Sequence, residues 1–143
     1  MRKAVIGVAV VVFSLVAVFA ASATTTATTK LEATLNGKAE GAPKTNRGKV
    51  EVRLNAATGK VCWDFTLAKI DGKPNQAHIH KGKAGVAGNV VVPLGATYKR
   101  QGCTSAAKSL VKAILKSPGS YYVNVHNAKR PAGAMRGQLA RGA

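Results

Sequence analysis

Residues 50–67 read VEVRLNAATGKVCWDFTL and carry the clearest structural signal in the chain. The first five alternate apolar with charged side chains, and the last seven, Val61–Leu67, again place an apolar side chain at every second position. Successive side chains of a β-strand point to opposite faces, so each half is typical of a strand with one buried face. The turn-forming residues Asn55–Gly59 lie between the two halves. We therefore predict a β-hairpin with Trp63 in the core.

Shorter segments on both sides of this hairpin show the same alternation. We expect further strands at Leu31–Leu35, Ala77–His80, Val90–Leu94, Tyr121–His126 and Ala134–Leu139. The polar stretch Lys38–Arg47 is predicted to be a loop or an edge strand, and Lys81–Asn89 a glycine-rich loop. Apolar residues at helical spacing predict one short helix at Ala106–Lys116. Many short strands with one short helix favour an all-β, antiparallel β-sandwich.

The first 23 residues are predicted to be a signal peptide. Arg2 and Lys3 precede an uncharged apolar stretch that reaches about Ala20, and small residues then offer a cleavage position near Ala23. The alternative is a retained membrane anchor, because the apolar stretch approaches the ~18 residues of a spanning helix. Cleavage predicts a secreted or periplasmic protein without a membrane span. It would consist of a flexible lead-in at 24–30 and one β domain at 31–143.

Basic residues outnumber acidic ones by 22 to 5. Without Arg2 and Lys3 the net charge is still about +15, which favours anionic cell-surface or extracellular polymers as partners, unless the charge serves solubility alone. The lysines are scattered along the sequence and aromatic residues are few, so the sequence has no specific nucleic-acid motif. The five carboxylates are dispersed, and no serine lies in a nucleophile motif. This composition favours a non-enzymatic protein.

Cys62 and Cys103 are the two cysteines of the chain. An even number of cysteines in an exported protein predicts one disulfide, although free thiols or pairing between chains are alternatives. Their spacing is far from the C-x-x-C pattern of redox-active pairs. We expect the bridge to join the outer side of the Val61–Leu67 strand to a later loop.

Several segments, taken in order, resemble the CHRD (chordin-type) domain family. They are ATLNG at 33–37, AHIH at 77–80 with the glycine loop after it, Gly102-Cys103, YYVNVH at 121–126 and RGQL at 136–139. The resemblance is to single-domain secreted members of bacterial type. It implies an immunoglobulin-like or superoxide-dismutase-like Greek-key sandwich. It implies no reaction, because a domain family does not by itself carry an activity.

All three histidines lie in the matched segments. His78 and His80 share one face of a predicted strand, and His126 can approach them if its strand is a neighbour. Three imidazoles suit Cu²⁺ or Zn²⁺. The arrangement is similar to the H-x-H strand and distant histidine of copper,zinc superoxide dismutases, but the additional histidine and aspartate cluster of those enzymes is missing. The alternative is a structural role in which the imidazoles hydrogen-bond side chains or backbone carbonyls.

Three polar residues of the same segments are candidates for supporting the histidines. The amide oxygens of Asn124 and Gln138 could accept from the imidazoles, since metal-bound imidazoles usually donate their other N–H to a partner, and Arg136 could lie near them as a supporting group. The alternative for Arg136 is an ion pair with Asp64 or Glu51. Two functions remain open at this point: a non-enzymatic extracellular binding or structural module with a basic surface, and a small copper- or zinc-binding protein in redox chemistry or metal handling.

Overall fold

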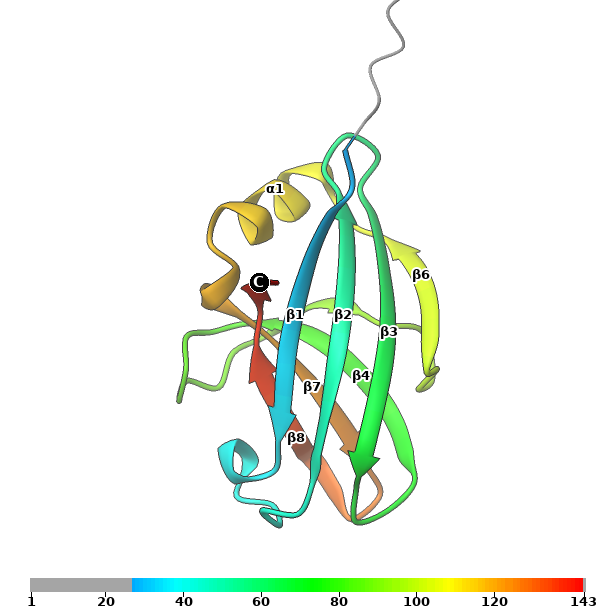
Figure 1. Ribbon diagram of the computed structural model, residues 1–143, viewed down its shortest axis with the longest axis vertical. Helices are drawn as coiled ribbons and strands as arrows, with labels where there is room; N and C mark the ends of the chain where they lie inside the picture. Colours follow the sequence, from blue (N-terminus) through cyan, green and yellow to red (C-terminus); the bar gives the residue numbers. More distant parts are fainter. Residues whose placement is uncertain (1–26, 143) are drawn as a thin grey trace, which may run out of the picture.

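The computed structural model describes residues 27–142 and is shown in Figure 1. The predicted signal peptide lies outside the described residues. The strands are β1 (Thr29–Asn36), β2 (Arg47–Asn55), β3 (Lys60–Lys69), β4 (Pro74–Lys81), β5 (Val90–Pro93), β6 (Gln101–Ser105), β7 (Tyr121–Asn127), β8 (Arg130–Gln138) and β9 (Ala140–Arg141). The helices are α1 (Lys108–Lys116) and the 3₁₀ turns η1 (Lys38–Glu40) and η2 (Pro118–Ser120). Among these residues no helix is long and apolar enough to cross a membrane.

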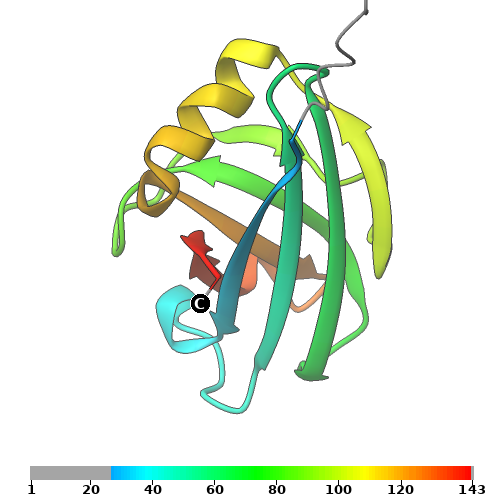
Figure 2. The same cartoon turned by 45° about the horizontal axis from the view of Figure 1, so that its top comes forward.

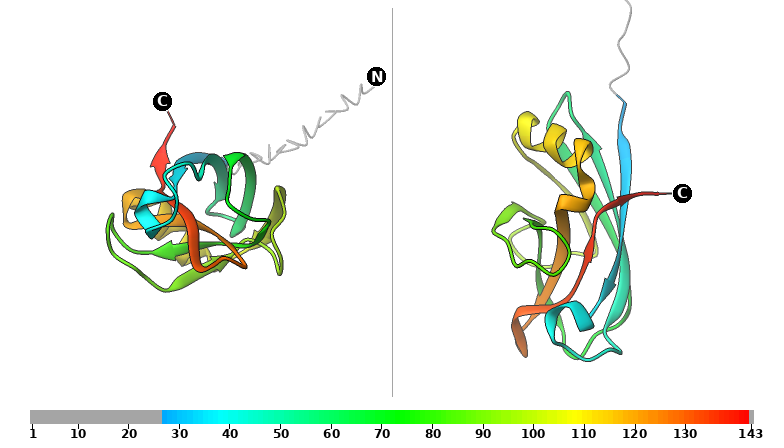
Figure 3. Two further views of the ribbon diagram at one scale, coloured as in Figure 1. Left: turned by 90° about the horizontal axis from the view of Figure 1, so that it is seen from below. Right: turned by 90° about the vertical axis from the view of Figure 1, so that its left-hand side faces the viewer.

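All strand pairs are antiparallel, and the path through the sheet is β5-β4-β7-β8-β1-β2-β3-β6, with β9 paired to β1. The sheet folds over on itself, so that β1, β2 and β3 face β4 and β7 across the interior (Figures 1 and 2). The two layers are joined where β1 meets β8, through the single pair Asn36 and Arg136. Seen end-on, the sheet is nearly closed (Figure 3). The predicted all-β antiparallel class with one short helix is confirmed.

The core consists of the period-two apolar positions of both layers. Burial alternates residue by residue along β1, β2 and most of β3, as the sequence predicts. Trp63 and Phe65 are among the largest fully or nearly fully buried side chains, and Ile79, Val123 and Val125 meet them from the other layer. The side chains that alternate with these positions therefore lie on the outer faces of the sheet, where a site can be built.

Helix α1 closes the upper end of the interior in Figure 1. Val111 and Ile114 are fully buried, whereas the lysines of the helix are exposed, which is the amphipathic arrangement that the sequence predicts. At the C-terminal end of the helix, Arg141 donates to the Leu115 carbonyl at 2.9 Å and satisfies one of the acceptors that a helix end leaves free.

Strands β4, β6 and β8 differ from the sequence-based expectation. Cys103 lies in strand β6 and directly opposite Cys62 on β3, not in a loop, and the two form the predicted disulfide. Strands β4 and β8 begin earlier than predicted, because their polar first halves pair with neighbours without burying apolar side chains. The segment Lys38–Arg47 is a loop, the first of its two predicted alternatives: it contains η1 and turns, and β2 begins at its last residue.

Candidate metal centre

Strands β4 and β7 are neighbours, and this brings the histidines together. In their antiparallel register, His78 is opposite Asn124 and Gln76 is opposite His126. Because Ala77 and Ile79 point into the core, His78 and His80, which alternate with them, point to the outer face of the sheet. The neighbouring strand that the sequence argument required is therefore present.

The three imidazoles form a compact cluster. One ring nitrogen from each of His78, His80 and His126 lies within 4.8 Å of the others. The shortest approach is 3.1 Å, between Nδ1 of His78 and Nε2 of His126. Ring centroids are 4.9 Å apart for His78 and His126, and 5.7 Å apart for His78 and His80.

Backbone carbonyls fix the tautomers of two of the rings. Nδ1 of His80 lies 2.9 Å from the Gly88 carbonyl oxygen, and Nδ1 of His126 lies 2.9 Å from the Pro131 carbonyl oxygen. A carbonyl oxygen only accepts, so both Nδ1 atoms carry the hydrogen and both Nε2 atoms carry a lone pair when the rings are neutral. The lone pair of His126 Nε2 accepts from Nδ1 of His78 at 3.1 Å. Nε2 of His80 is buried and has no hydrogen-bond partner. A buried lone pair without a partner is costly unless something binds it.

The glycine-rich loop at 82–89 covers the cluster on the outside of the sheet. Its Gly88 N–H donates to the Tyr122 hydroxyl at 3.1 Å, and the Tyr122 ring stacks on His80 with centroids 4.8 Å apart. The guanidinium of Arg136 lies over the opposite side of this assembly, 4.7 Å from the Tyr122 ring centre. His80 is buried beneath these groups, and His126 is buried beside Pro131 of β8, although both histidines lie outside the hydrophobic core.

This environment keeps imidazoles neutral. Burial, followed by the nearby His126 and His80, lowers the pKa of His78 from 6.5 to about 4. The pKa of His80 is also lowered, mainly by burial and against the effect of its hydrogen bond to Gly88. At neutral pH these two rings therefore hold lone pairs rather than positive charge, which is the form that binds metal ions.

The dimensions of the cluster fit a transition-metal ion. The three ligand nitrogens form a triangle whose sides do not exceed 4.8 Å. An ion at the centre of that triangle would lie within about 2.8 Å of each nitrogen. Zinc–imidazole bonds are about 2.0–2.1 Å long, so each ring would have to move by less than about 1 Å. Three imidazoles around one point leave a fourth position for water or a small ligand, as in catalytic and transport sites rather than closed structural ones.

The residues predicted to support the histidines have other partners. Arg136 pairs with Glu40, with Nε and Oε1 3.3 Å apart, and donates to the Val86 carbonyl, so the alternative pairing with Asp64 or Glu51 is wrong. Asp64 instead pairs with Arg100. The supporting contacts to the imidazoles come from the two backbone carbonyls.

Asn124 and Gln138 contact the backbone near the cluster. The Asn124 amide donates to the Ala132 carbonyl at 3.4 Å, and the Gln138 amide donates to the carbonyls of Gly82, Gly119 and Tyr121. Gln138 thus anchors the start of the covering loop to the strand edge. Neither side chain is within hydrogen-bond distance of an imidazole among residues 27–142.

Sequence reasoning missed Glu40 and Tyr122 as parts of this region. Glu40 lies in a polar loop without periodicity, and burial raises its pKa although Arg136 acts in the opposite direction. Tyr122 alternates with the core residues of β7, so its position on the outer face was available from the period-two pattern. Its stacking on His80 could not be predicted, because it depends on the register between β4 and β7, in which His80 lies opposite Tyr122.

Comparison with known proteins gives one match. The family model described as the CHRD domain matches residues 31–139, which is nearly all of the described chain. A search of curated proteins found no match to the chain, and neither did a search of solved structures.

Proposed function

The chain belongs to the CHRD domain family, and from that premise we propose that it binds one Cu²⁺ or Zn²⁺ ion through His78, His80 and His126. One observation carries the proposal: three imidazole nitrogens from two strands lie within 4.8 Å of one another. A purely structural role explains the ring nitrogens that are hydrogen-bonded, but it leaves His80 Nε2 buried without a partner. A metal ion would satisfy that atom.

The ligand atoms follow from the tautomers. His80 and His126 would bind through Nε2, because their Nδ1 hydrogens are held by carbonyls. Such outer hydrogen bonds orient a ligating imidazole and raise its basicity. His78 would bind through Nδ1, the atom that faces Nε2 of His126 at 3.1 Å, and the ring would then carry its hydrogen on Nε2 instead. A bound ion would supply a Lewis acid with one open position, or in the case of copper a redox couple.

Uptake of metal by the purified, metal-free protein tests this proposal. Equilibrium dialysis against Cu²⁺ or Zn²⁺ followed by elemental analysis should give about one ion per chain. Replacing His80 by alanine should abolish uptake of that ion. Gln76→Ala is the matched control, because Gln76 is an exposed residue of the same strand opposite His126. Equal uptake by wild type and His80→Ala would refute the proposed site.

A second function, binding of anionic polymers outside the cell, is favoured by the pairing of charges. Each of the five aspartate and glutamate side chains has a basic partner: Lys30 for Glu32, Lys30 and Arg53 for Glu51, Arg100 for Asp64, Arg130 for Asp71 and Arg136 for Glu40. Twenty basic residues lie within residues 27–142, and the remaining fifteen have no carboxylate within ion-pair distance there. An uncompensated field of this size attracts polyanions.

This second function supposes export, and the disulfide is consistent with export because such bonds persist in oxidising compartments. Retention of the protein on an anionic matrix should be strong at low ionic strength and fade as salt screens the attraction. Retention that ignores salt would exclude charge as the reason for binding.

A further inference from the structure

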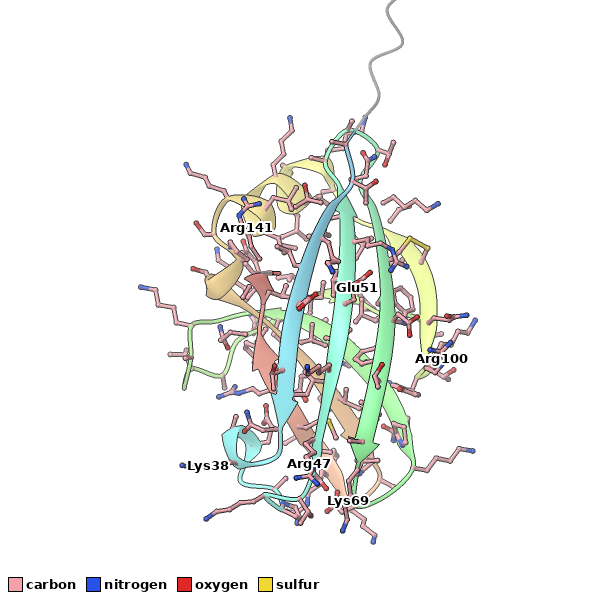
Figure 4. All side chains as sticks on the ribbon, viewed as in Figure 1. Lys38, Arg47, Glu51, Lys69, Arg100 and Arg141 are labelled. Carbon is pink, nitrogen blue, oxygen red and sulfur yellow. A yellow bond between two sulfur atoms is a disulfide. The ribbon has the colours of Figure 1, made fainter. Side chains whose placement is uncertain are left out.

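One end of the molecule carries six of the fifteen cations that have no ion-pair partner among residues 27–142. It is formed by the loop after β1, the β3–β4 turn and the β7–β8 turn, at the lower end of Figure 1. Lys38, Arg47 and Lys69 are labelled there in Figure 4. We call the exposed cations of these turns the basic end; they are Lys38, Lys44, Arg47, Lys69, Lys73 and Lys129.

Hydrogen bonds to one carboxylate hold the loops of the basic end together. Asp71 accepts from the amides of Asn46 at 2.8 Å and Asn127 at 3.3 Å, and from Arg130 at 3.3 Å. Asn46 and Asn127 are fully buried, and the pKa of Asp71 is lowered, chiefly by the Asn46 hydrogen bond. Since Arg130 compensates Asp71, the ordered end keeps its excess of positive charge.

A cleft adjoins the basic end. Its volume is about 460 Å³, within the range of small-ligand sites, and it is lined by Lys73, Pro74, Asn75, Thr97, Tyr98 and Ala128. Lys129 follows Ala128 in the chain, and its aliphatic part lies beside Gly72. The cleft therefore has one cation in its wall and another at its margin.

Tyr98 supplies an aromatic wall. Its ring packs on Phe65 with centroids 5.4 Å apart and lines both this cleft and a neighbouring hollow beside Phe65 and Leu67. The Tyr98 N–H donates to the Asn75 carbonyl at 2.7 Å, which fixes the backbone of the wall. A rigid aromatic face next to amide and hydroxyl side chains is suited to a sugar ring, which presents C–H bonds to the ring and hydroxyls to the polar groups.

We propose that this cleft binds a sugar unit of an acidic polysaccharide, while Lys73 and Lys129 contact carboxylates of the polymer and Lys69, at the same end of the molecule, adds to the attraction. The inference rests on the second proposed function and assigns it a site and a ligand class. One feature argues against nucleic acid. The cleft offers one aromatic ring, whereas single-strand platforms stack successive bases on several.

Binding of polygalacturonate, a polymer of sugar carboxylates, tests the proposal. Replacing Lys69, Lys73 and Lys129 together by glutamine should weaken binding about tenfold or more at moderate salt. The matched control is the glutamine triple at Lys108, Lys112 and Lys116, which are equally exposed and lie on α1 at the opposite end. It should weaken binding less than about threefold. Equal losses from the two triples would overturn the site while leaving charge-driven binding intact.

The aromatic wall is tested by comparing two polymers. Tyr98→Ala should weaken polygalacturonate binding and leave binding of inorganic polyphosphate, which has no sugar ring, unchanged. Asn75→Glu places a negative charge in the cleft at an exposed position and should weaken binding of both polyanions. Ser105→Glu, exposed near the other end, is its control and should weaken binding less. Parallel losses for both polymers in Tyr98→Ala, equal losses from the two glutamates, or tighter binding of oligodeoxythymidine than of polygalacturonate, would refute the proposed ligand. If wild-type retention on anionic matrices does not depend on salt, the second proposed function itself fails.

Discussion

Acidification of the metal-free protein from pH 7 to pH 5 should destabilise it, and the effect should be traceable to His78. The chain contains three histidines, all of them in the cluster, and unperturbed imidazoles titrate in this range. In the folded state the pKa of His78 is about 4, whereas the unfolded chain has the ordinary value of 6.5. The unfolded state therefore takes up the proton first, and the free energy of unfolding falls as the pH falls through this window.

The size of the effect follows from the two pKa values. Between pH 7 and pH 5, linkage for a shift from 6.5 to about 4 gives about 2 kcal/mol. The His78 ring is partly exposed and solvent screens its interactions, so we expect about 1 kcal/mol. His80, whose pKa is also lowered, adds to the loss. Glu40 acts in the opposite direction, because burial raises its pKa and its folded form retains a proton that the unfolded form releases.

The assay is urea unfolding of wild type and His78→Gln at both pH values. Glu40 is present in both proteins, so the difference between their pH dependences isolates the histidine. Wild type should lose about 1 kcal/mol more than the variant on acidification. If both proteins lose the same stability, His78 is not held neutral by its surroundings and the electrostatic description of the cluster is wrong.

Two further predictions concern the scaffold that carries the cluster. Replacing both cysteines of the Cys62–Cys103 disulfide, which are 41 residues apart, by alanine should reduce the free energy of unfolding by about 4 kcal/mol in the chain-entropy description; a loss below about 1 kcal/mol in urea unfolding would contradict this. Gly137→Ala should cost about 2–3 kcal/mol, because its Cβ would overlap the Thr34 carbonyl oxygen where β8 meets β1. Gly119→Ala, where a Cβ meets nothing within 4 Å, should leave the thermal midpoint nearly unchanged, and equal effects of the two alanines would argue against the close approach.

The strands with an apolar face could be predicted from the sequence, and those without one could not. Alternation of apolar and polar residues located β1, β2, β3 and β7, because in each of them one side chain in two is buried against the other layer. Strand β6 was missed because its sequence, QGCTS, contains no alternating apolar residues and it pairs at the edge of the sheet. The polar first halves of β4 and β8 were missed for the same reason.

In the candidate site, the histidine cluster could be predicted from the sequence, whereas the contacts around it could not. The H-x-H spacing placed His78 and His80 on one face, and the neighbouring strand for His126 was stated as a condition that the structure meets. The cover over the cluster depends on tertiary contacts. The carbonyls of Gly88 and Pro131 and the Arg136–Glu40 pair join segments whose sequences have no periodicity. Backbone carbonyl partners in particular have no signature in a sequence, because every residue supplies one.

Counting the imidazole ligands of a bound ion tests the central claim most directly. X-ray absorption spectroscopy of the protein loaded with one equivalent of Zn²⁺, together with pulsed electron paramagnetic resonance of the Cu²⁺ form, reports how many imidazoles bind and at what distance. We expect three imidazole nitrogens at about 2.0 Å in wild type and two or fewer after His80→Ala. A wild-type spectrum with at most one imidazole, or one that the His80 substitution leaves unchanged, would contradict the account.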